Sequence, residues 1–295
     1  VATAAVFADE ILVGTIEPLP EEDREHALTF YVSPNAPGVS LISRSSYEAS
    51  AHSGADHPLS SRLDENDALL VLENVFIPWE RLLIYRDAAR NSAIWWDTPA
   101  YINMAHQASI RFWTKLEFMA GVAGLIVRSN GLEKIPQARE KLGQLLAHVQ
   151  TAKSMVLAAE TAHSSLPEDH GVVRLNQDIV YAQRAFAAEV YPKFIHELRM
   201  LCGSSLIQTP DSHADLASPI LGPLLTQICR SAETPASERL RLMRLVWDLT
   251  CSEFGNRHAH YEQFAQGAPH VYLGQMSATG SREEYMRYAA QALEL

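Results

Sequence analysis

The stretch PAYINMAHQASIRFWTKLEFMAGVAGLIVRSNG, residues 99–131, decides the fold class of this chain. Its apolar side chains recur about every 3.6 residues, the period of an amphipathic helix. They mark one face with Ile102, Ala105, Ile110, Trp113, Leu116, Met119, Ala120 and Ala123. Asn130 and Gly131 supply a C-terminal stop. The stretch therefore predicts one long helix with a buried side.

Three further segments carry the same period, so four long helices are expected in all. The three are residues 136–163, 174–201 and 235–264. The last begins with Thr234 followed by Pro235, a good pair for the start of a helix. Ser281 and Glu284 form a capping box for a short final helix. Long helices with compact connections indicate a helical bundle, which we assign to residues 87–295.

The first 86 residues lack the helical period of the later segments. Short β-prone runs alternate there with Pro, Gly and Asn turn signals. We expect strands in the runs 1–7, 11–16, 27–32, 39–43, 68–72 and 75–77. Such runs are typical of an antiparallel sheet or a small barrel. The sequence thus predicts an α+β chain in two parts, a β module at 1–86 followed by the bundle.

Composition excludes several classes of protein. The 295 residues carry 24 Lys and Arg against 35 Asp and Glu, a net charge of −11, which argues against a nucleic-acid partner. Hydrophobic residues make up 47%, enough for a full core. No apolar run approaches the ~18 residues of a membrane-spanning helix, so no membrane partner is expected. Cys202, Cys229 and Cys251 lie far apart, which favours reduced thiols and a cytoplasmic location.

Two long motifs carry a family resemblance. The first is ISRSSYE at 42–48 followed by HPLSSRLDENDALLVLENVFIPWERLLIYRD at 57–87. The second lies in the fourth long helix, with WD at 247–248, SEFGNRH at 252–258 and YE at 261–262. In this order the motifs closely resemble the large oxygenase component of the 4-hydroxyphenylacetate 3-hydroxylase family, which comprises two-component flavin-dependent aromatic monooxygenases.

The resemblance implies a fold similar to acyl-CoA dehydrogenases. Such a fold has an N-terminal helical domain, a central β barrel and a C-terminal four-helix bundle, with reduced FAD between barrel and bundle. Residues 1–86 would be part of the barrel, and the helical domain would precede residue 1. The family's Arg, Tyr and His that bind and deprotonate the phenol would also lie there, so the catalytic residues are expected outside this sequence. The resemblance further implies a homodimer or homotetramer.

The implied reaction converts a phenol to a catechol with O2 and with reduced FAD from a separate reductase. The cofactor carries the hard step, while the protein orients the phenol and excludes water. Two alternatives stay open. One is a dehydratase similar to 4-hydroxybutyryl-CoA dehydratase, which needs an iron–sulfur cluster and for which His196 and Cys202 are the nearest candidates. The other is a non-catalytic chain that supplies oligomerisation and a flavin scaffold.

The resemblance also assigns cofactor-binding roles. Positions near the flavin in the family correspond here to Thr3, Tyr261, Glu262, Gln266 and Gly267. Arg111 and Lys115, one helical turn apart, form a cationic pair suited to the pyrophosphate. Gly203 and Ser204 form a turn that can approach a flavin phosphate or the adenosine of a neighbouring subunit.

The loop that covers the substrate in the family corresponds to Gly14, Thr15 and Ile16. Glu17 follows them, and its charge would disfavour an anionic arylacetate, so the phenol is expected to differ from 4-hydroxyphenylacetate itself. No metal site is expected. His258 and His260 are two positions apart on a helix and face different directions, so we interpret them as hydrogen-bonding or solvent-facing groups.

Overall fold

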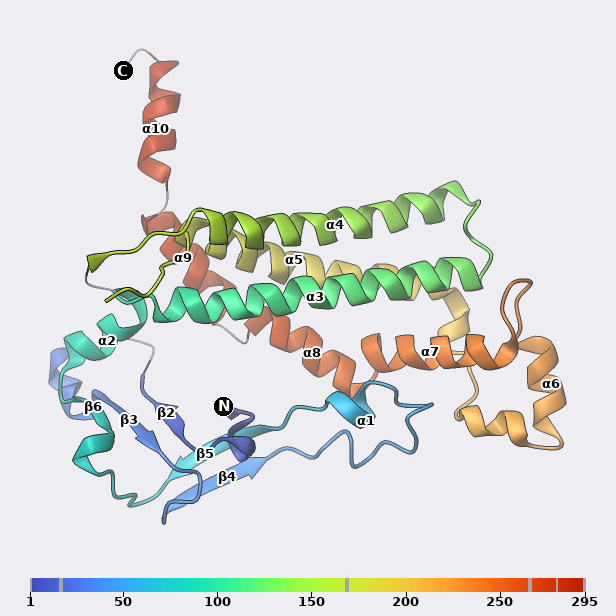
Figure 1. Ribbon diagram of the computed structural model, residues 1–295, viewed down its shortest axis with the longest axis horizontal. Helices are drawn as coiled ribbons and strands as arrows, with labels where there is room; N and C mark the ends of the chain where they lie inside the picture. Colours follow the sequence, from blue (N-terminus) through green and yellow to red (C-terminus); the bar gives the residue numbers. More distant parts are fainter. Residues whose placement is uncertain (1, 16–17, 168–169, 265–266, 280, 294–295) are drawn as a thin grey trace.

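The computed structural model describes residues 2–15, 18–167, 170–264, 267–279 and 281–293. Long helices run side by side in one layer, and the strands of the N-terminal part lie below one end of that layer (Figure 1). Shorter helices of the C-terminal part lie below the other end. The described chain is therefore a mixed structure in which helices predominate. A division between residues 86 and 87 stays a prediction.

Within the described residues the strands form two antiparallel sheets of three strands each. The first has the order β1 (Ala2–Thr3), β5 (Asp67–Leu72), β4 (Val39–Ser43), and the second has the order β2 (Ile11–Val13), β3 (Leu28–Val32), β6 (Leu82–Tyr85). Neither order closes on itself, so the barrel stays a prediction.

The predicted strand 1–7 is reduced to β1, because Ala4 has a φ of 60° and Ala5–Phe7 form a 3-10 turn. A second predicted strand, residues 75–77, is wrong. Asn74 precedes it with a φ of 52°, a left-handed conformation that turns the chain out of β5. Phe76 is consequently 83% exposed. The strand β6 follows instead, after Pro78 and Trp79, which interrupt the apolar pattern of the sequence.

The C-terminal part is built from helices. They are α2 (Ala88–Trp96), α3 (Ala100–Ser129), α4 (Pro136–Thr161), α5 (Gln177–Cys202), α6 (Leu221–Ile228), α7 (Ala236–Thr250), α8 (Glu253–Phe264), α9 (Pro269–Thr279) and α10 (Arg282–Gln291). Short 3-10 turns occur in both parts of the chain. They are η1 (Ala5–Phe7), η2 (Glu21–His26) and η3 (Trp79–Arg81) in the N-terminal part, and η5 (Gly203–Leu206) and η6 (His213–Ala217) in the C-terminal part. Helices α3, α4 and α5 agree with the prediction to within a few residues. Helices α2, α6 and α9 are not among the predicted elements.

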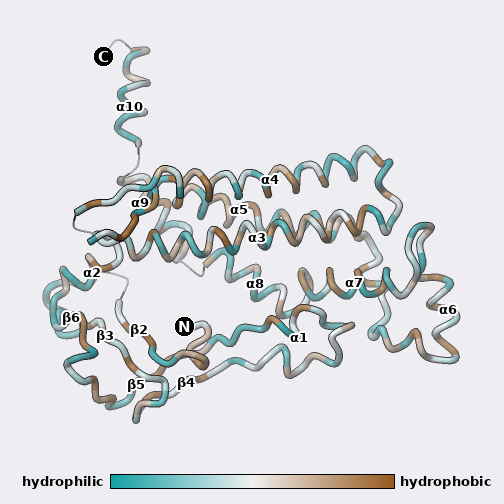
Figure 2. Tube along the Cα trace, in the orientation of Figure 1, coloured by the Kyte–Doolittle hydropathy of each residue, from teal (hydrophilic) through white to brown (hydrophobic). Residues whose placement is uncertain are grey.

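The core is centred on α3, where brown segments recur at helical spacing along the tube in Figure 2. Its completely buried large side chains are Phe112, Leu116, Met119 and Ile126, and they pack with residues of α4, α5 and α7. Ile110, expected in the buried face, is 38% exposed, because the true face is the row through Phe112 and Leu116. No helix in the described part is both long enough and apolar enough to cross a membrane.

The fourth long helix, predicted as one element over 235–264, is two helices with a break at Cys251 and Ser252. The Ser252 Oγ accepts a hydrogen bond from the Gly255 N–H at 3.0 Å, and this bond caps the N-terminus of α8. Gly255 also lies against the end of α7. A Cβ at this position would stand 2.5 Å from the Leu249 carbonyl oxygen, so the close approach requires glycine.

Two side chains at helix ends depart from local expectation. Ser281 makes no capping bond to α10, and its hydroxyl lies 3.3 Å from Asp178, so the predicted capping box is wrong although the helix exists. The short α1 (Ser60–Leu63) takes its cap from α7. There the buried Asp248 carboxylate accepts the N–H groups of Leu59 and Ser60 at 2.8 and 2.9 Å.

Candidate functional site

Glu262 of α8 is the centre of a charged cluster between α8 and α3. Its carboxylate is 0% exposed. Lys115 donates to Glu262 Oε1 at 2.6 Å, and Arg111 donates to both carboxylate oxygens at 3.3 and 3.1 Å. Arg111 and Lys115 are four residues apart on α3, which places both on one helix face. The cluster therefore joins the first and last long helical segments of the bundle.

The cluster carries more positive than negative charge. Two cations face one carboxylate, and the fully buried Arg184 of α5 adds a weak 3.4 Å bond to the Glu262 carbonyl oxygen. Burial alone would raise the pKa of Glu262, but Lys115 and Arg111 hold it below its usual value. Burial lowers the pKa of Lys115, and its pairing with Glu262 partly offsets this effect. Such a cluster favours a further anion in its vicinity.

A second network ties α8 to the β module. Arg257 donates to both oxygens of Asp67 at 2.9 and 2.6 Å and to Glu65 at 2.6 Å. Arg44 of the β module donates to Asp67 at 3.0 Å, and the Thr3 hydroxyl donates to Asp67 at 2.9 Å. Although burial would raise the pKa of Asp67, Arg257 and Arg44 hold it far below its usual range. Asp67 is therefore ionised at neutral pH.

Tyr261 connects the two networks. The Arg111 guanidinium carbon lies 4.6 Å from the centre of its ring, and that of Arg257 lies 4.4 Å away. Both distances are within the range of cation–π attraction. The ring of Tyr261 is thus held between one cation from α3 and one from its own helix.

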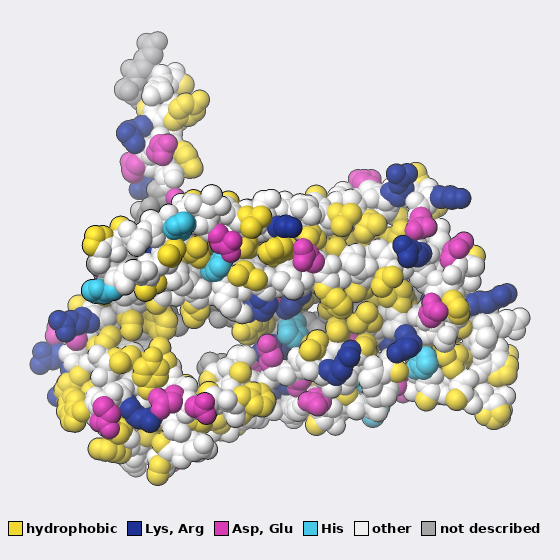
Figure 3. Space-filling view, in the orientation of Figure 1, with side chains coloured by type: hydrophobic (Ala, Val, Ile, Leu, Met, Phe, Trp, Pro, Cys, Tyr) yellow, Lys and Arg dark blue, Asp and Glu magenta, His cyan; other side chains and the backbone are white. Residues whose placement is uncertain are grey.

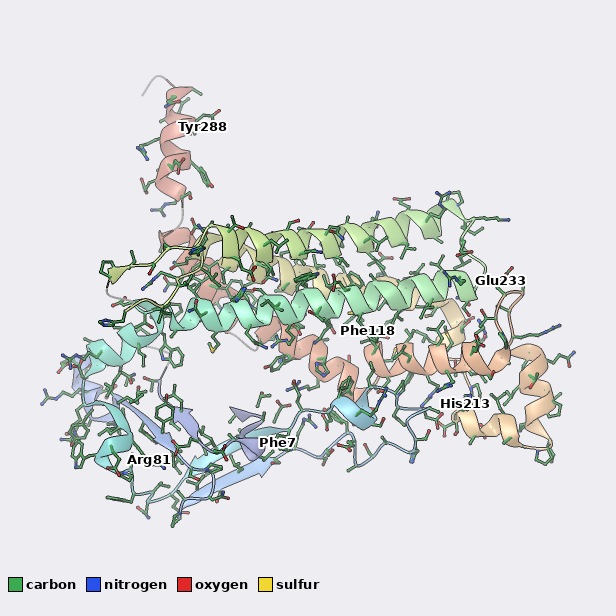
Figure 4. All side chains as sticks on the ribbon, in the orientation of Figure 1. Phe7, Arg81, Phe118, His213, Glu233 and Tyr288 are labelled. Atoms are coloured by element: carbon green, nitrogen blue, oxygen red, sulfur yellow. The ribbon has the colours of Figure 1, made fainter. Side chains whose placement is uncertain are left out.

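A cavity of about 460 Å³ opens between α3, α5, α8 and the segment around α1. Its lining combines the apolar side chains Leu59, Leu63, Phe118, Leu249 and Phe254 with Arg111, Thr114, Lys115, Glu65, Tyr191 and His258. Phe118 lies on the side of α3 that faces α7 and α8 (Figure 4). Dark-blue and cyan side chains gather beside an opening between the strands and the helices in Figure 3. We call the cavity of about 460 Å³ the junction cavity.

Two polar atoms beside the junction cavity have no hydrogen-bond partner among the described residues, the hydroxyl of Tyr191 and Nε2 of His258. Both atoms are closed to solvent. Burial raises the pKa of Tyr191, so its phenol stays neutral. Burial and the cations Lys115 and Arg257 lower the pKa of His258 to about 3, so its imidazole is neutral as well. Unpaired buried polar atoms are uncommon and often mark a functional group.

The structure brings five of the sequence-predicted cofactor residues into one region. Arg111, Lys115, Tyr261 and Glu262 form the cluster, and Thr3 joins it through Asp67 and Arg257. Gly267 follows α8 in a left-handed conformation with a φ of 93°. Gln266 lies outside the described residues.

Gly203 and Ser204 lie at the opposite end of the bundle, after α5. Their neighbours line a separate polar pocket of about 450 Å³ that contains Ser205, Arg230 and Arg239. The Arg239 guanidinium donates to the Ser205 hydroxyl at 2.6 Å. This pocket is a second place where cations and hydroxyls converge.

The expected substrate loop is anchored to α2. A Cβ on Gly14 would lie 2.9 Å from the Thr29 hydroxyl, so the strand packs closely there. The Thr15 carbonyl oxygen accepts from Trp95 at 3.0 Å, and its hydroxyl accepts from Asn91. Ile16 and Glu17 lie outside the described residues.

The sequence alone assigns no role to Arg257 or Tyr191 and no specific one to His258. The signal for Arg257 and His258 was their place in the SEFGNRH motif. His196 is exposed on the outside of α5 whereas Cys202 is buried, so the pair considered for a cluster does not converge. Burial raises the pKa of the Cys202 thiol to about 12. The described residues contain no group of three His, Cys, Asp or Glu able to hold a metal ion.

Known proteins resemble the chain over nearly its whole length. Residues 91–294 match the family model described as 4-hydroxyphenylacetate 3-hydroxylase C terminal, and residues 1–84 match the one described as 4-hydroxyphenylacetate 3-hydroxylase N terminal. The 4-hydroxyphenylacetate 3-monooxygenase oxygenase component of Geobacillus sp. is 31% identical over 99% of this chain and 59% of its own length. The pyoverdin chromophore biosynthetic protein PvcC of Pseudomonas aeruginosa is 33% identical over 97% and 56%. The chain thus spans somewhat more than half the length of these relatives.

Solved structures agree. The oxygenase component HpaB of 4-hydroxyphenylacetate 3-monooxygenase matches with a TM-score of 0.93 at 29% identity, over 99% of this chain and 61% of that one. A 4-hydroxybutyryl-CoA dehydratase from N. maritimus, at 17% identity with a TM-score of 0.84, and a glutaryl-coenzyme A dehydrogenase, at 14% with 0.51, share the fold alone. The fold is therefore of the acyl-CoA dehydrogenase kind, and the chain belongs to the 4-hydroxyphenylacetate 3-hydroxylase family.

Proposed function

We propose that this chain is part of the oxygenase component of a two-component monooxygenase, which hydroxylates a phenol at the ortho carbon with reduced FAD and O2. The observation that carries the proposal is the junction cavity, where apolar walls meet a cluster with excess positive charge. A relative of this family has been crystallised with FAD and 4-hydroxyphenylacetate.

The residues present fit a flavin dinucleotide. Such a molecule joins a flat, largely apolar ring system to an anionic pyrophosphate. The junction cavity offers Leu59, Phe118 and Phe254 for the former and Arg111 with Lys115 for the latter. The pocket beside Ser204 and Arg239 is a second candidate for a phosphate, in line with the expected role of Gly203 and Ser204. When bound, reduced FAD supplies the electrons that activate O2 for transfer to the aromatic ring.

The chain's own residues then have three tasks. Leu59, Phe118 and Phe254 give the junction cavity apolar walls, which disfavour water beside a reactive reduced cofactor. Glu262 holds the side chains of Arg111 and Lys115 in fixed positions through charge-assisted hydrogen bonds. Thr3, Asp67 and the loop at Gly14 and Thr15 bring the β module against the helices.

The proposal includes two kinds of partner. A separate reductase supplies the reduced flavin, because the relatives are named as oxygenase components. We also propose that copies of the chain associate as a dimer or tetramer. Support comes from exposed apolar side chains at peripheral helices, such as Ile220 and Ile228 at the two ends of α6 and Tyr288 on α10, which projects from the body (Figures 1 and 4). Sedimentation equilibrium measures the association directly.

Titration with FAD tests the core of the proposal. We expect the chain to quench flavin fluorescence on binding, and we expect Lys115→Gln to weaken FAD binding at least about tenfold, since a charge-assisted contact contributes about 1.5–3 kcal/mol. Lys141→Gln is the matched control, because Lys141 pairs with Glu197 at 2.8 Å on the surface of the bundle. Absence of FAD binding would overturn the proposal.

Product analysis tests the chemistry. With reductase-supplied FADH2, O2 and a panel of small phenols, the native protein is expected to release a catechol. Formation of hydrogen peroxide alone with every phenol would contradict the hydroxylase assignment and would leave the flavin-scaffold alternative in its place. Lys115→Gln could instead bind FAD as tightly as wild type while Arg239→Gln binds it more weakly. That result would assign the phosphate to the pocket beside Ser204 and not to the junction cavity.

A further inference from the structure

His258 sits at the junction cavity in a way that fixes its chemistry. Its Nδ1 atom lies 3.2 Å from the Lys115 ammonium. Its ring packs edge-on against Phe254, with the ring centres 4.4 Å apart. Its Nε2 atom is closed to solvent and has no hydrogen-bond partner among the described residues. Nδ1 of the ring is therefore engaged by Lys115, whereas Nε2 makes no hydrogen bond within the described residues.

The position of Lys115 decides which nitrogen carries the proton. An ammonium group donates hydrogen bonds and cannot accept one. Glu262 lies 2.6 Å from the Lys115 ammonium and favours its charged form, in which Nδ1 of His258 accepts. A neutral imidazole with an accepting Nδ1 carries its hydrogen on Nε2.

The surrounding charges keep His258 from taking a second proton. The groups that face it are the cations Lys115 and Arg111 from α3 and Arg257 from α8, against Glu262 and the cavity-lining Glu65. Burial and the cations outweigh the carboxylates, and the pKa of His258 falls to about 3. The Nε2–H is therefore present over the whole physiological pH range.

We propose that Lys115 fixes His258 as the Nε2–H tautomer and that this N–H donates a hydrogen bond to an acceptor atom of the flavin in the junction cavity. A buried N–H without an acceptor is unfavourable, and a ligand carbonyl or ring nitrogen removes that penalty. Nε2 is closed to solvent, so binding has to be accompanied by a side-chain shift, which is common at binding sites. Lys115 then positions His258 in addition to its proposed contact with the pyrophosphate, and His258 is a binding residue. The hydrogen bond from His258 to the flavin rests on the proposed function, whereas the tautomer does not.

The tautomer is measured without flavin, by NMR of the chain labelled with nitrogen-15 in its histidines. The chain has 12 histidines, and the signal of His258 is the one that disappears in His258→Gln. We expect a neutral ring protonated on Nε2 that does not titrate between roughly pH 5 and 8. In Lys115→Met we expect a mixture of tautomers and a pKa nearer the ordinary value of 6.5. A ring that is protonated on Nδ1, or that titrates near neutral pH in wild type, would overturn the inference.

The donor role is measured by FAD affinity in three variants. His258→Gln keeps an N–H near the position of Nε2 and should bind FAD within about threefold of wild type. His258→Leu removes the donor and should bind about tenfold more weakly, as expected for one lost hydrogen bond to a buried group. His260→Leu is the matched control, because His260 is exposed on the same helix. Equal binding by His258→Leu and wild type would overturn the donor role. If wild type binds no FAD at all, the proposed function fails, and the NMR result alone then decides the tautomer.

Discussion

Arg257 of α8 and Asp67 of β5 form a bidentate pair across 190 positions of sequence, with nitrogen–oxygen distances of 2.9 and 2.6 Å. The side chains are only 10% and 20% exposed. A planar guanidinium matches a carboxylate in this geometry, so the pair fixes orientation as well as distance. It joins the β module to the helices at the edge of the junction cavity.

Replacing Arg257 by leucine should lower the free energy of unfolding by roughly 3 kcal/mol, because it leaves the half-buried Asp67 with fewer partners. Urea unfolding measures the loss. The control is Arg86→Leu, whose pair with Glu25 is exposed and is expected to contribute less than about 1 kcal/mol. Equal losses of unfolding free energy in the two variants would show that the pair of Arg257 with Asp67 stabilises the chain no more than an exposed ion pair does.

Stability should fall in acid because of Asp67. Its pKa in the folded chain lies well below the ordinary 3.8, so its ionised form contributes stability that is complete above the unfolded pKa. That contribution is lost as pH falls below about 4. We expect the free energy of unfolding to decrease as the pH falls from roughly 4 toward the much lower folded-state pKa, and Asp67→Asn to reduce this slope. An unchanged slope in Asp67→Asn would count against the assignment.

Glu262→Gln should destabilise the chain by roughly 3 kcal/mol, since it leaves two largely buried cations, Arg111 and Lys115, without their carboxylate. Thermal unfolding of the variant measures this directly. Glu197→Gln provides the comparison, because its partner Lys141 is nearly half exposed. We expect that variant to unfold within a few degrees of wild type.

Two glycine substitutions should act in opposite directions. Gly255→Ala places a methyl group 2.5 Å from the Leu249 carbonyl oxygen, so the junction of α7 and α8 has to move and the protein is destabilised. Gly121→Ala in the middle of α3 meets no atom within 4 Å. It should stabilise the chain by roughly 0.5–1 kcal/mol through helix propensity. Chemical denaturation of both variants checks the pair, and destabilisation by Gly121→Ala would contradict the packing described for α3.

The three longest helices were predictable because an uninterrupted apolar period extends over many turns in each. The break between α7 and α8 was not, because it depends on Ser252 as a cap and on the backbone contact at Gly255, neither of which disturbs the apolar period. Strand β6 and the helices α2, α6 and α9 escaped for a related reason, since short elements give a weak periodic signal.

The candidate site was predictable in part. The spacing of Arg111 and Lys115 predicts a shared face, but their partner Glu262 lies 151 and 147 positions away, and no local pattern shows that it takes up their charge. The same holds for His258. A lone histidine on a helix has no evident role until the fold places Lys115 beside one of its nitrogens.

The cap that α7 provides for α1 constrains the order of folding. A helix of four residues cannot nucleate by itself, and the groups that start it find their acceptor in Asp248, 189 positions after Leu59. The segment leading into β5 therefore reaches its final shape only after the bundle has formed. Substitutions at Asp248 should for that reason speed unfolding and leave the rate of bundle formation largely unchanged, because a contact made late in folding is absent from the transition state.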